Sequence, residues 1–481
     1  MRYISTRGSM APADFTEVLL SGLAPDGGLA VPAELPQLET EQLETWRGLD
    51  YAALATEVIG LFATDIPRQD LQALTAAAYG PTRFPAPVVP VTPIGEVADA
   101  LTLVGLSQGP TMAFKDLAMQ FLGQAIPYVL TRQGRVLNIL GATSGDTGSA
   151  AEHAFRGQEG VSVVMLSPAG RMSDVQRAQM YSLQDANIHN IAVRGVFDDC
   201  QSLVKELSND AAFKAAHSLG AVNSINIGRI AAQAVYYVWS WLRTSDHLPH
   251  QRRSGHLVDV CVPSGNFGNI YAGFLARSMG VPIRRLILAT NENNVLEEFF
   301  STGVYAPRSG EATLATSSPS MDISRASNLE RFIWALLGPQ EFMRRWAELE
   351  ETGRMDLSGE VARMRKAGFV AASSTHSDRL EAIRAVHEAT GLLIDPHTAD
   401  GVTAARRLME PGFPTMVLET AQAAKFPETV AEALGTEPPV PPEVAELLSL
   451  PQRVETIDNE SAPLRAIIEE RALRPTQPHQ D

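Results

Sequence analysis

The stretch RVLNILGATSGDTGSAAEHAFRG, residues 135–157, places an apolar run, a loop and a helical pattern in direct succession. Its first part, RVLNILGA, is a short apolar run of the kind that forms a buried strand. The small residues and glycines of TSGDTG end that run, and SAAEHAF continues with a helical pattern. A strand, a loop and a helix in this order are the repeating unit of an α/β fold.

The same order recurs along the chain. VSVVMLSP is followed by MSDVQRAQMYSL, LVDVCVPSG by GNIYAGFLARSMG and then IRRLILATN, and FPTMVLET by PETVAEALG. Strands that alternate with helices pair in parallel, because each helix returns the chain to the same end of the sheet. We therefore predict an α/β fold with largely parallel sheets.

Composition divides the chain into four predicted parts. Residues 1–92 carry helical patterns and close in the proline-rich phrase YGPTRFPAPVVPVTP, which favours a boundary. Residues 93–235 and residues 236–435 are each predicted to form an α/β domain, and residues 436–481 a C-terminal tail. The second of these parts contains the TSGDTG loop, and the third contains a second glycine-rich loop, PSGNFGN.

Charge and cysteine content exclude several classes of protein. The net charge of −16 argues against a basic surface for nucleic acid or for an anionic membrane. The two cysteines, Cys200 and Cys261, are far apart and have no metal-ligand spacing, so no metal site is expected. The first residues, MRYISTRG, do not resemble a secretory signal, and no stretch is long and apolar enough to span a bilayer. We expect a cytoplasmic protein.

Lysine is rare in this sequence. Of the 39 basic residues, five are lysines. One of them, Lys115, stands in GPTMAFKDLAMQF (residues 109–121), beside the apolar stripe and near the first turn of a predicted helix. A cation there faces the positive end of the helix dipole. Either the side chain reaches water, or the chemistry requires an amine, since an amine can lose its proton and form a Schiff base whereas a guanidinium cannot.

The loop GATSGDTG, residues 141–148, follows a predicted strand and opens a helix. Its glycines allow the backbone to approach a ligand closely, and the helix N-terminus offers free N–H groups to a carboxylate or phosphate. Asp146 would repel such an anion unless it faces another group. The alternative is a tight turn in which Asp146 or Thr147 caps the helix.

Two further loops follow predicted strands. PSGNFGN, residues 263–269, has the composition of a backbone nest for phosphate, although it matches neither the P-loop nor the dinucleotide motif. A glycine-rich turn without a ligand is the alternative. In ETAQAAKF, residues 419–426, Thr420 stands at the end of a strand, where its hydroxyl could reach a ligand or cap a helix.

Taken together, PTMAFKD, SGDTG, PSGNFGN and a threonine before AKF occur in an order that resembles the threonine synthases. These are fold-type II pyridoxal phosphate enzymes, and the resemblance is to their longer microbial and fungal branch. YISTRG, NSIN, SNLER and PHTA resemble that branch as well, so that the likeness covers roughly residues 1–435. It implies a fold like that of the tryptophan synthase β subunit: two open, twisted, mainly parallel sheets and a helical N-terminal region.

The resemblance also implies roles for individual residues. Lys115 would bind pyridoxal phosphate as a Schiff base and then carry protons, while Thr420 would meet the pyridine nitrogen. The backbone that would cradle the cofactor phosphate belongs to Gly265, Asn266, Phe267, Gly268 and Asn269. The residues that would bind the substrate are Ser144, Gly145, Asp146 and Thr147 for its amino acid part, and Asn223 and Arg229 for its phosphate.

The implied reaction converts O-phospho-L-homoserine and water to L-threonine and phosphate, in a monomer or homodimer. Some positions depart from the family pattern: Gln108 and Gln422 replace histidines, and DISRASN contains Arg325 and Ala326. Glutamine cannot titrate near neutral pH. Two alternatives therefore remain: a related fold-type II lyase, such as a dehydratase or phospho-lyase with another substrate, or a protein that retains the cofactor with reduced activity.

Overall fold

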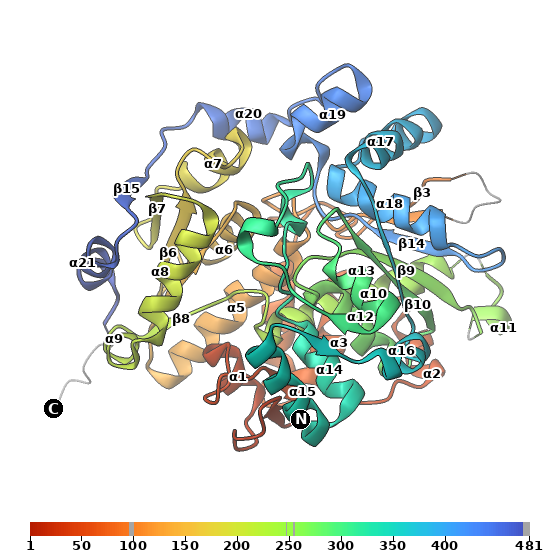
Figure 1. Cartoon of the computed structure of the whole chain (residues 1–481), viewed down its shortest axis with the longest axis horizontal. Coiled ribbons are helices and arrows are strands. Elements are labelled where there is room, and N and C mark those ends of the chain that lie inside the picture. The colour runs from red at the N-terminus through yellow and green to blue at the C-terminus, as the bar shows by residue number, and fades with distance from the viewer. Residues whose placement is uncertain (96–100, 247, 254, 475–481) are drawn as a thin grey trace.

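The computed structural model describes residues 1–95, 101–246, 248–253 and 255–474 (Figure 1). The N-terminal region is mainly helical, as predicted, and also contains a small antiparallel pair of strands. Its elements are β1 (Tyr3–Ser5), α1 (Phe15–Ser21), β2 (Ala30–Pro32), α2 (Thr40–Trp46), α3 (Tyr51–Phe62) and α4 (Arg68–Tyr79).

A six-stranded sheet lies on the right of Figure 1 and has the order β13-β10-β9-β14-β4-β3. Neighbouring strands are parallel except for β3, which is antiparallel to β4. In chain order its strands are β3 (Val91–Pro93), β4 (Leu101–Val104), β9 (Val258–Pro263), β10 (Ile283–Thr290), β13 (Phe369–Ser373) and β14 (Thr415–Leu418).

A five-stranded sheet lies on the left of Figure 1, and all its pairs are parallel, in the order β15-β7-β6-β5-β8. The predicted α/β class with mainly parallel sheets is confirmed. In chain order its strands are β5 (Leu137–Ala142), β6 (Val161–Pro168), β7 (Ile188–Arg194), β8 (Leu219–Gly220) and β15 (Glu455–Asp458).

Helices follow most of the parallel strands. Those near the five-stranded sheet are α6 (Asp146–Phe155), α7 (Asp174–Tyr181), α8 (Phe197–Asn209), α9 (Ala211–Ala216), α20 (Pro442–Ser449) and α21 (Ser461–Arg471). The others are α5 (Lys115–Gln133), α10 (Ile227–Thr244), α11 (His250–Arg253), α12 (Gly268–Ser278), α13 (Val295–Thr302), α14 (Leu329–Leu337), α15 (Pro339–Thr352), α16 (Val361–Lys366), α17 (His376–Thr390), α18 (Pro396–Leu408) and α19 (Pro427–Leu434).

Short elements complete the described chain. β11 and β12 form an antiparallel pair beside α13 and α15. These elements are β11 (Val304–Tyr305), β12 (Met355–Asp356) and the 3₁₀ turns η1 (Gly310–Ala312), η2 (Pro319–Met321), η3 (Ser358–Glu360) and η4 (Ala423–Lys425). Among the described helices, none combines the length and the apolar character needed to cross a bilayer.

The central strands are buried along their whole length, which explains why they read as continuous apolar runs. Every residue of β6 and of β9 is buried. Parallel sheets are covered by helices on both faces, so their strands do not show the alternation of a half-exposed strand. The carboxyl ends of β5, β9 and β14 lead directly into the three loops singled out in the sequence.

Membership of the two sheets does not follow the predicted boundaries. β4 lies within predicted part 93–235, yet it pairs with β14 in the six-stranded sheet. β15 lies in the predicted tail, yet it extends the five-stranded sheet by pairing with β7. Pairing between strands so far apart in the sequence depends on tertiary contacts. A change of composition along the chain therefore does not predict which strands share a sheet. Residues 96–100 and 475–481 of the predicted parts lie outside the described residues.

Helices α5 and α6 pack against each other at a glycine. A Cβ placed on Gly123 of α5 would lie 2.4 Å from the backbone oxygen of Ala154 in α6. Real Cβ atoms do not approach a carbonyl oxygen so closely, so only glycine allows this spacing. The two helices begin at Lys115 and Asp146, and their separation therefore also sets the distance between these two side chains.

We predict that Gly123→Ala destabilises the fold by about 1–3 kcal/mol, because α5 and α6 must move apart. Gly60→Ala is the matched control: it is also inside a helix, but its added Cβ would lie 3.4 Å from the side chain of Leu71, and alanine has the higher helix propensity. Urea denaturation followed by circular dichroism measures both. Equal midpoints for the two variants would contradict the close packing of α5 on α6.

Candidate active site

Two segments far apart in the sequence pair beside the start of α5. The backbone N–H of Phe114 donates to the carbonyl oxygen of Thr420 at 2.9 Å, and that of Gln422 donates to the oxygen of Met112 at 3.1 Å. A bridge between Ala113 and Ala421 completes the pairing. Lys115, the first residue of α5, is thereby held next to the loop that follows β14.

The ammonium group of Lys115 forms an ion pair with Asp146. Its Nζ lies 3.1 Å from Asp146 Oδ2, and the side chains are 12% and 4% exposed. The same Nζ lies 4.8 Å from the centre of the Phe114 ring. Asp146 is the first residue of α6, directly after the glycine-rich loop. The lysine therefore does not extend into water but points at a carboxylate on the neighbouring helix.

A second buried lysine contacts the same carboxylate. Nζ of Lys425 lies 2.7 Å from Asp146 Oδ1, and its side chain is fully buried. It also donates to the carbonyl oxygen of Thr111 at 2.9 Å. Two neutral groups complete the environment of the carboxylate: Gln176 Nε2 donates to Oδ1 and Ser320 Oγ donates to Oδ2, both at 3.2 Å.

Opposing effects set the protonation of this cluster. Burial lowers the pKa of Lys115; Asp146 acts against this, while Lys425 and Arg229 lower it further, and the net shift is downward. Burial alone would raise the pKa of Asp146, but Lys115 and Lys425 hold it well below its usual value. Asp146 is therefore ionised and faces cations, which answers the concern that its charge would repel an anion from this loop.

The loop before α6 is capped by a different residue from those considered in the sequence. Thr143 Oγ1 accepts the backbone N–H groups of Gly145 and Gly148 at 2.9 and 2.8 Å. Gly145 has φ of +137°, and a Cβ there would lie 2.4 Å from the amide carbon of Gln176. Asp146 is consequently free to face the lysines. Ser144 is exposed and Thr147 is half-buried.

The loop after β9 turns sharply at Phe267, the residue before α12. Phe267 has φ of +62°, an unusual value for a residue with a side chain. Its ring is buried against Phe300 and Phe369, with centroid distances of 5.7 and 5.6 Å. The packing of this ring holds the loop in place. The left-handed backbone at Phe267 and the N-terminus of α12 form the type of concavity that binds anions.

Asparagines and a glycine hold this loop against its neighbours. Asn269 Oδ1 accepts from the hydroxyls of Tyr236 and Tyr237 at 2.6 and 2.9 Å. The carbonyl oxygen of Asn266 accepts from the backbone N–H and the side chain of Asn328, both at 3.1 Å. A Cβ on Gly265 would lie 3.1 Å from the carbonyl oxygen of Ser320, so the loop also packs on the segment that reaches Asp146.

Ser320 and His397 connect these segments. The backbone N–H of Ser320 donates to His397 Nε2 at 3.0 Å, and His397 Nδ1 lies 2.7 Å from Asp395 Oδ1. Because Nε2 accepts a hydrogen bond, the ring proton is on Nδ1, facing Asp395. His397 thus supports Ser320, whose hydroxyl binds Asp146.

Arg229 is a buried cation on α10. Burial lowers the pKa of Arg229 to about 10. Nη1 donates to the carbonyl oxygen of Val222 at 3.3 Å, and Nε has no hydrogen-bond partner within the described chain. A buried guanidinium without a carboxylate at hand suits an anionic ligand. Asn223, which the sequence led us to expect beside Arg229, is exposed. The next residue, Ser224, lies near the loop after β9, because its carbonyl oxygen is 3.6 Å from a Cβ placed on Gly268.

Several buried polar atoms of the predicted site and its neighbouring segments find no partner among the residues that the structure describes. They lie at the strand ends and on α10 and α12: Ser264 Oγ, Asn269 Nδ2, Thr420 Oγ1 and Arg229 Nε. Buried polar groups in proteins are normally paired, so a group of such atoms indicates a polar ligand. A hydroxyl at the end of β14, a turn at a helix N-terminus and a buried lysine fit the ring nitrogen, phosphate and aldehyde of pyridoxal phosphate.

Gln108 and Gln422, where the resemblance led us to expect histidines, both lie close to Ser107 and Glu419. Gln422 Nε2 donates to the carbonyl oxygen of Ser107 at 3.0 Å. Ser107 Oγ in turn donates to Glu419 Oε2 at 2.5 Å. Burial raises the pKa of Glu419 to about 7, while hydrogen bonds from Ser107 and Gln108 lower it. A buried carboxyl group with a pKa near neutrality therefore lies next to these glutamines.

Sequence reasoning missed four contributors: Lys425, Ser320, Gln176 and Thr398. Thr398 Oγ1 accepts the backbone N–H of Thr420 at 3.1 Å. The scarcity of lysine was a signal that could have found Lys425, since it is one of only five. The other three are common polar residues whose roles arise from contacts across the fold.

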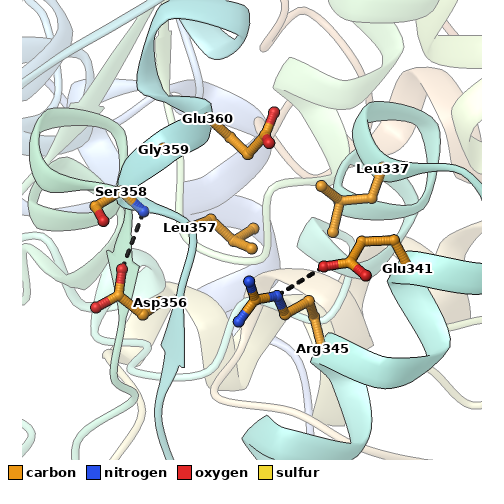
Figure 2. Close-up of a pocket in the computed structure, with 8 residues that line it drawn as sticks. All are labelled: Leu337, Glu341, Arg345, Asp356, Leu357, Ser358, Gly359 and Glu360. Atoms are coloured by element: carbon orange, nitrogen blue, oxygen red, sulfur yellow. Dashed lines mark hydrogen bonds and ion pairs between the residues drawn. The ribbon is translucent and has the colours of Figure 1, made fainter.

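The pocket in Figure 2 lies elsewhere, between α14, α15 and the turn after β12. Its volume is about 280 Å³. Its charged groups all have partners: Arg345 Nε lies 2.9 Å from Glu341 Oε1, and Asp356 and Glu360 pair with Arg354 and Arg363. The backbone N–H of Ser358 also donates to Asp356 at 3.0 Å. None of its lining residues belongs to the cluster around Lys115, so the site is assigned by chemistry and not by this cavity.

Family comparisons agree with this geometry. Residues 2–79 match the model "Threonine synthase N terminus", residues 81–418 match "Pyridoxal-phosphate dependent enzyme", and residues 398–468 match "Threonine synthase, C-terminal". A threonine synthase of Methylobacillus glycogenes is 50% identical over 98% of this chain and 100% of its own length. The chain belongs to the threonine synthase family.

Further relatives support the same family. A threonine synthase of Corynebacterium glutamicum is 51% identical over 97% of this chain and 98% of its own. The crystal structure of a pyridoxal phosphate-bound threonine synthase from Brucella melitensis has a TM-score of 0.92 and 38% identity, covering 98% of this chain and 99% of that one. The predicted fold-type II architecture and the predicted cofactor are thus confirmed.

We predict that Thr420→Val weakens pyridoxal phosphate binding about tenfold, because one hydrogen bond contributes ~1.4 kcal/mol. The stability of the apoenzyme should change little, since the hydroxyl has no partner within the described chain. Fluorescence titration of the apoenzyme with the cofactor measures the affinity.

The matched control is Thr398→Val, whose hydroxyl binds Asp395 and the backbone of Thr420. It should lower the free energy of unfolding by about 1–3 kcal/mol, because Asp395 loses a partner in the interior. Unchanged cofactor affinity in Thr420→Val would show that this hydroxyl does not meet the ring.

Proposed function

We propose that the protein converts O-phospho-L-homoserine and water to L-threonine and phosphate, with pyridoxal phosphate bound at Lys115. The observation that carries the proposal is the buried Lys115–Asp146 pair, at 3.1 Å, beside an anion-binding turn and an unpaired strand-end hydroxyl. Membership of the threonine synthase family supports the choice of substrate.

Lys115 is assigned two tasks, covalent attachment of the cofactor and transfer of protons at the substrate. Both need an amine that loses its proton readily, and burial lowers the pKa of Lys115 as required. When bound, pyridoxal phosphate supplies the electron sink that makes carbon–hydrogen bonds next to the amino group acidic. Asp146 orients the lysine and stabilises its protonated form between transfers.

The loop after β9 and Thr420 are proposed to orient the cofactor. Gly265, Asn266, Phe267, Gly268 and Asn269 form the turn at the α12 N-terminus, whose free N–H groups suit the phosphate. Thr420 is proposed to meet the ring nitrogen with a neutral hydroxyl. A hydroxyl holds a proton on that nitrogen less firmly than a carboxylate would, because it carries no negative charge.

The substrate is proposed to lie between the SGDTG loop and α10. Ser144, Gly145, Asp146 and Thr147 surround the start of α6, where backbone N–H groups can bind the substrate carboxylate. The substrate phosphate is assigned to Arg229 and Asn223. A buried guanidinium with an unpaired Nε is well suited to a dianion. Burial of Asp146 and Arg229 also limits early access of water.

We infer that the protein acts in the cytoplasm as a monomer or homodimer on a small-molecule substrate. Its net charge of −16 supports the absence of nucleic acid and anionic membrane among its partners. The described residues contain no group of three or more His, Cys, Asp or Glu placed to hold a metal ion.

We predict that the purified holoenzyme, incubated with O-phospho-L-homoserine, releases threonine and phosphate in equal amounts. Amino acid analysis, a phosphate assay and a keto acid assay for 2-oxobutyrate are run on the same samples. Phosphate without threonine, or 2-oxobutyrate as the main product, would instead indicate the related lyase.

We further predict that Lys115→Ala loses both activity and covalent cofactor. Treatment of the wild-type holoenzyme with borohydride should fix the cofactor on the peptide that contains Lys115, as peptide mass spectrometry can show. Lys205→Ala, an exposed lysine on α8, should behave as wild type. Cofactor fixed to another lysine in the wild type would overturn the assignment.

A further inference from the structure

Two ammonium groups share one buried carboxylate in this fold. Lys115 Nζ contacts Oδ2 of Asp146 at 3.1 Å and Lys425 Nζ contacts Oδ1 at 2.7 Å. The second contact is the shorter of the two, and Lys425 is the more deeply buried lysine. Like charges in an interior of low dielectric constant repel one another, so the ammonium group of Lys425 destabilises the protonated form of Lys115.

A purely structural role for Lys425 would not need a charge. Its bonds to Asp146 and to the carbonyl oxygen of Thr111 connect η4 with the segments before α5 and α6. Neutral donors can make such bonds, and Gln176 Nε2 already does so to the same Oδ1 at 3.2 Å. Burying an ammonium group costs far more than burying an amide, so the charge of Lys425 calls for a reason beyond packing.

Lys425 and Lys115 contact different oxygens of the Asp146 carboxylate, so the charge of Lys425 acts on Lys115 through Asp146. When Lys115 is engaged covalently it no longer presents a full ammonium group to the carboxylate. Lys425 then remains as the partner that keeps Asp146 ionised and in place. When Lys115 is a free amine, the ammonium group of Lys425 still contacts one oxygen of the Asp146 carboxylate. The negative charge of Asp146 is then shared between two cations, so it stabilises the protonated form of Lys115 less.

Resting on the proposed function, in which Lys115 acts as a free amine, we propose that Lys425 is a positioning residue: its ammonium group fixes the Asp146 carboxylate and favours the uncharged, nucleophilic form of Lys115. Lys425 itself touches neither substrate nor cofactor in this assignment.

The charged groups that face the two lysines come from several elements. Asp146 of α6, Lys425 of η4 and Arg229 of α10 act on Lys115. Asp116 of α5, itself bound to Thr111, is influenced by Lys425, and the neutral ring of His397 of α18 supports Ser320, which donates to Asp146. Burial is the largest cause of the lowered pKa of Lys115, and Lys425 and Arg229 lower this pKa further. Asp146 acts in the opposite direction and raises it.

The experiment titrates Lys115 in the full-length apoenzyme, without cofactor or substrate. Formaldehyde and a borohydride reagent methylate only uncharged amines, and mass spectrometry of the Lys115 peptide gives the extent of reaction at each pH. The wild-type midpoint should lie below the ordinary lysine value of about 10.4. Lys425→Met should raise it by about one pH unit or more, because a repelling charge is removed.

Two matched variants separate charge from packing. Lys425→Arg keeps the charge and should restore a midpoint close to wild type, and Lys205→Met, at an exposed position on α8, should leave it unchanged. Asp146→Asn removes the carboxylate but keeps Lys425, so the midpoint should fall below wild type. A general loosening of the site would raise it instead, because water would reach Lys115.

An unchanged midpoint in Lys425→Met, or a raised midpoint in Asp146→Asn, overturns the proposal. If Lys425→Met does not fold, as judged by circular dichroism, Asp146→Asn and Lys425→Arg decide the question. The titration involves no turnover, so a failure to form threonine from O-phospho-L-homoserine would reject the proposed function while leaving this result standing, and the reverse also holds.

Discussion

The carboxylate of Asp146, buried between the ammonium groups of Lys115 and Lys425, is the contact on which the site depends. A buried carboxylate is stable only when its charge is balanced and its oxygens are hydrogen-bonded. Here four donors meet it from α5, η4, α7 and the segment around Ser320. The ion pairs and hydrogen bonds to this one carboxylate therefore hold together segments that follow strands of both sheets.

Parallel topology explains why these loops can meet. The glycine-rich loops follow the carboxyl ends of β5 in one sheet and of β9 and β14 in the other. In open α/β sheets, ligands bind beyond those ends because helix N-termini and unpaired backbone groups gather there. Chemistry and architecture are thus linked: the same strand–loop–helix unit that builds the fold also supplies a glycine-rich turn at a helix N-terminus, a buried amine and a strand-end hydroxyl.

Much of the fold could be predicted from local pattern. The apolar runs of β6 and β9 and the helical patterns beside them indicated parallel α/β sheets, and the motif containing Lys115 is indeed the start of a helix. The division into domains was less accessible. β4 joins the six-stranded sheet with β14, and β15 returns from the C-terminal part to β7. These pairings link residues hundreds of positions apart, and nothing local reports them.

By itself, the sequence determined the class of fold and the family, and it singled out Lys115, Thr420 and the two glycine-rich loops as candidates, because these depend on local periodicity and on residue types in a fixed order. Only the tertiary structure decided which groups contact the side chains of those residues. Asp146 could have capped its helix, but Thr143 takes that place and releases it to the lysines. Lys425 and Ser320 reach the site through contacts across the fold, since the balance of a buried charge is settled in space and not along the chain.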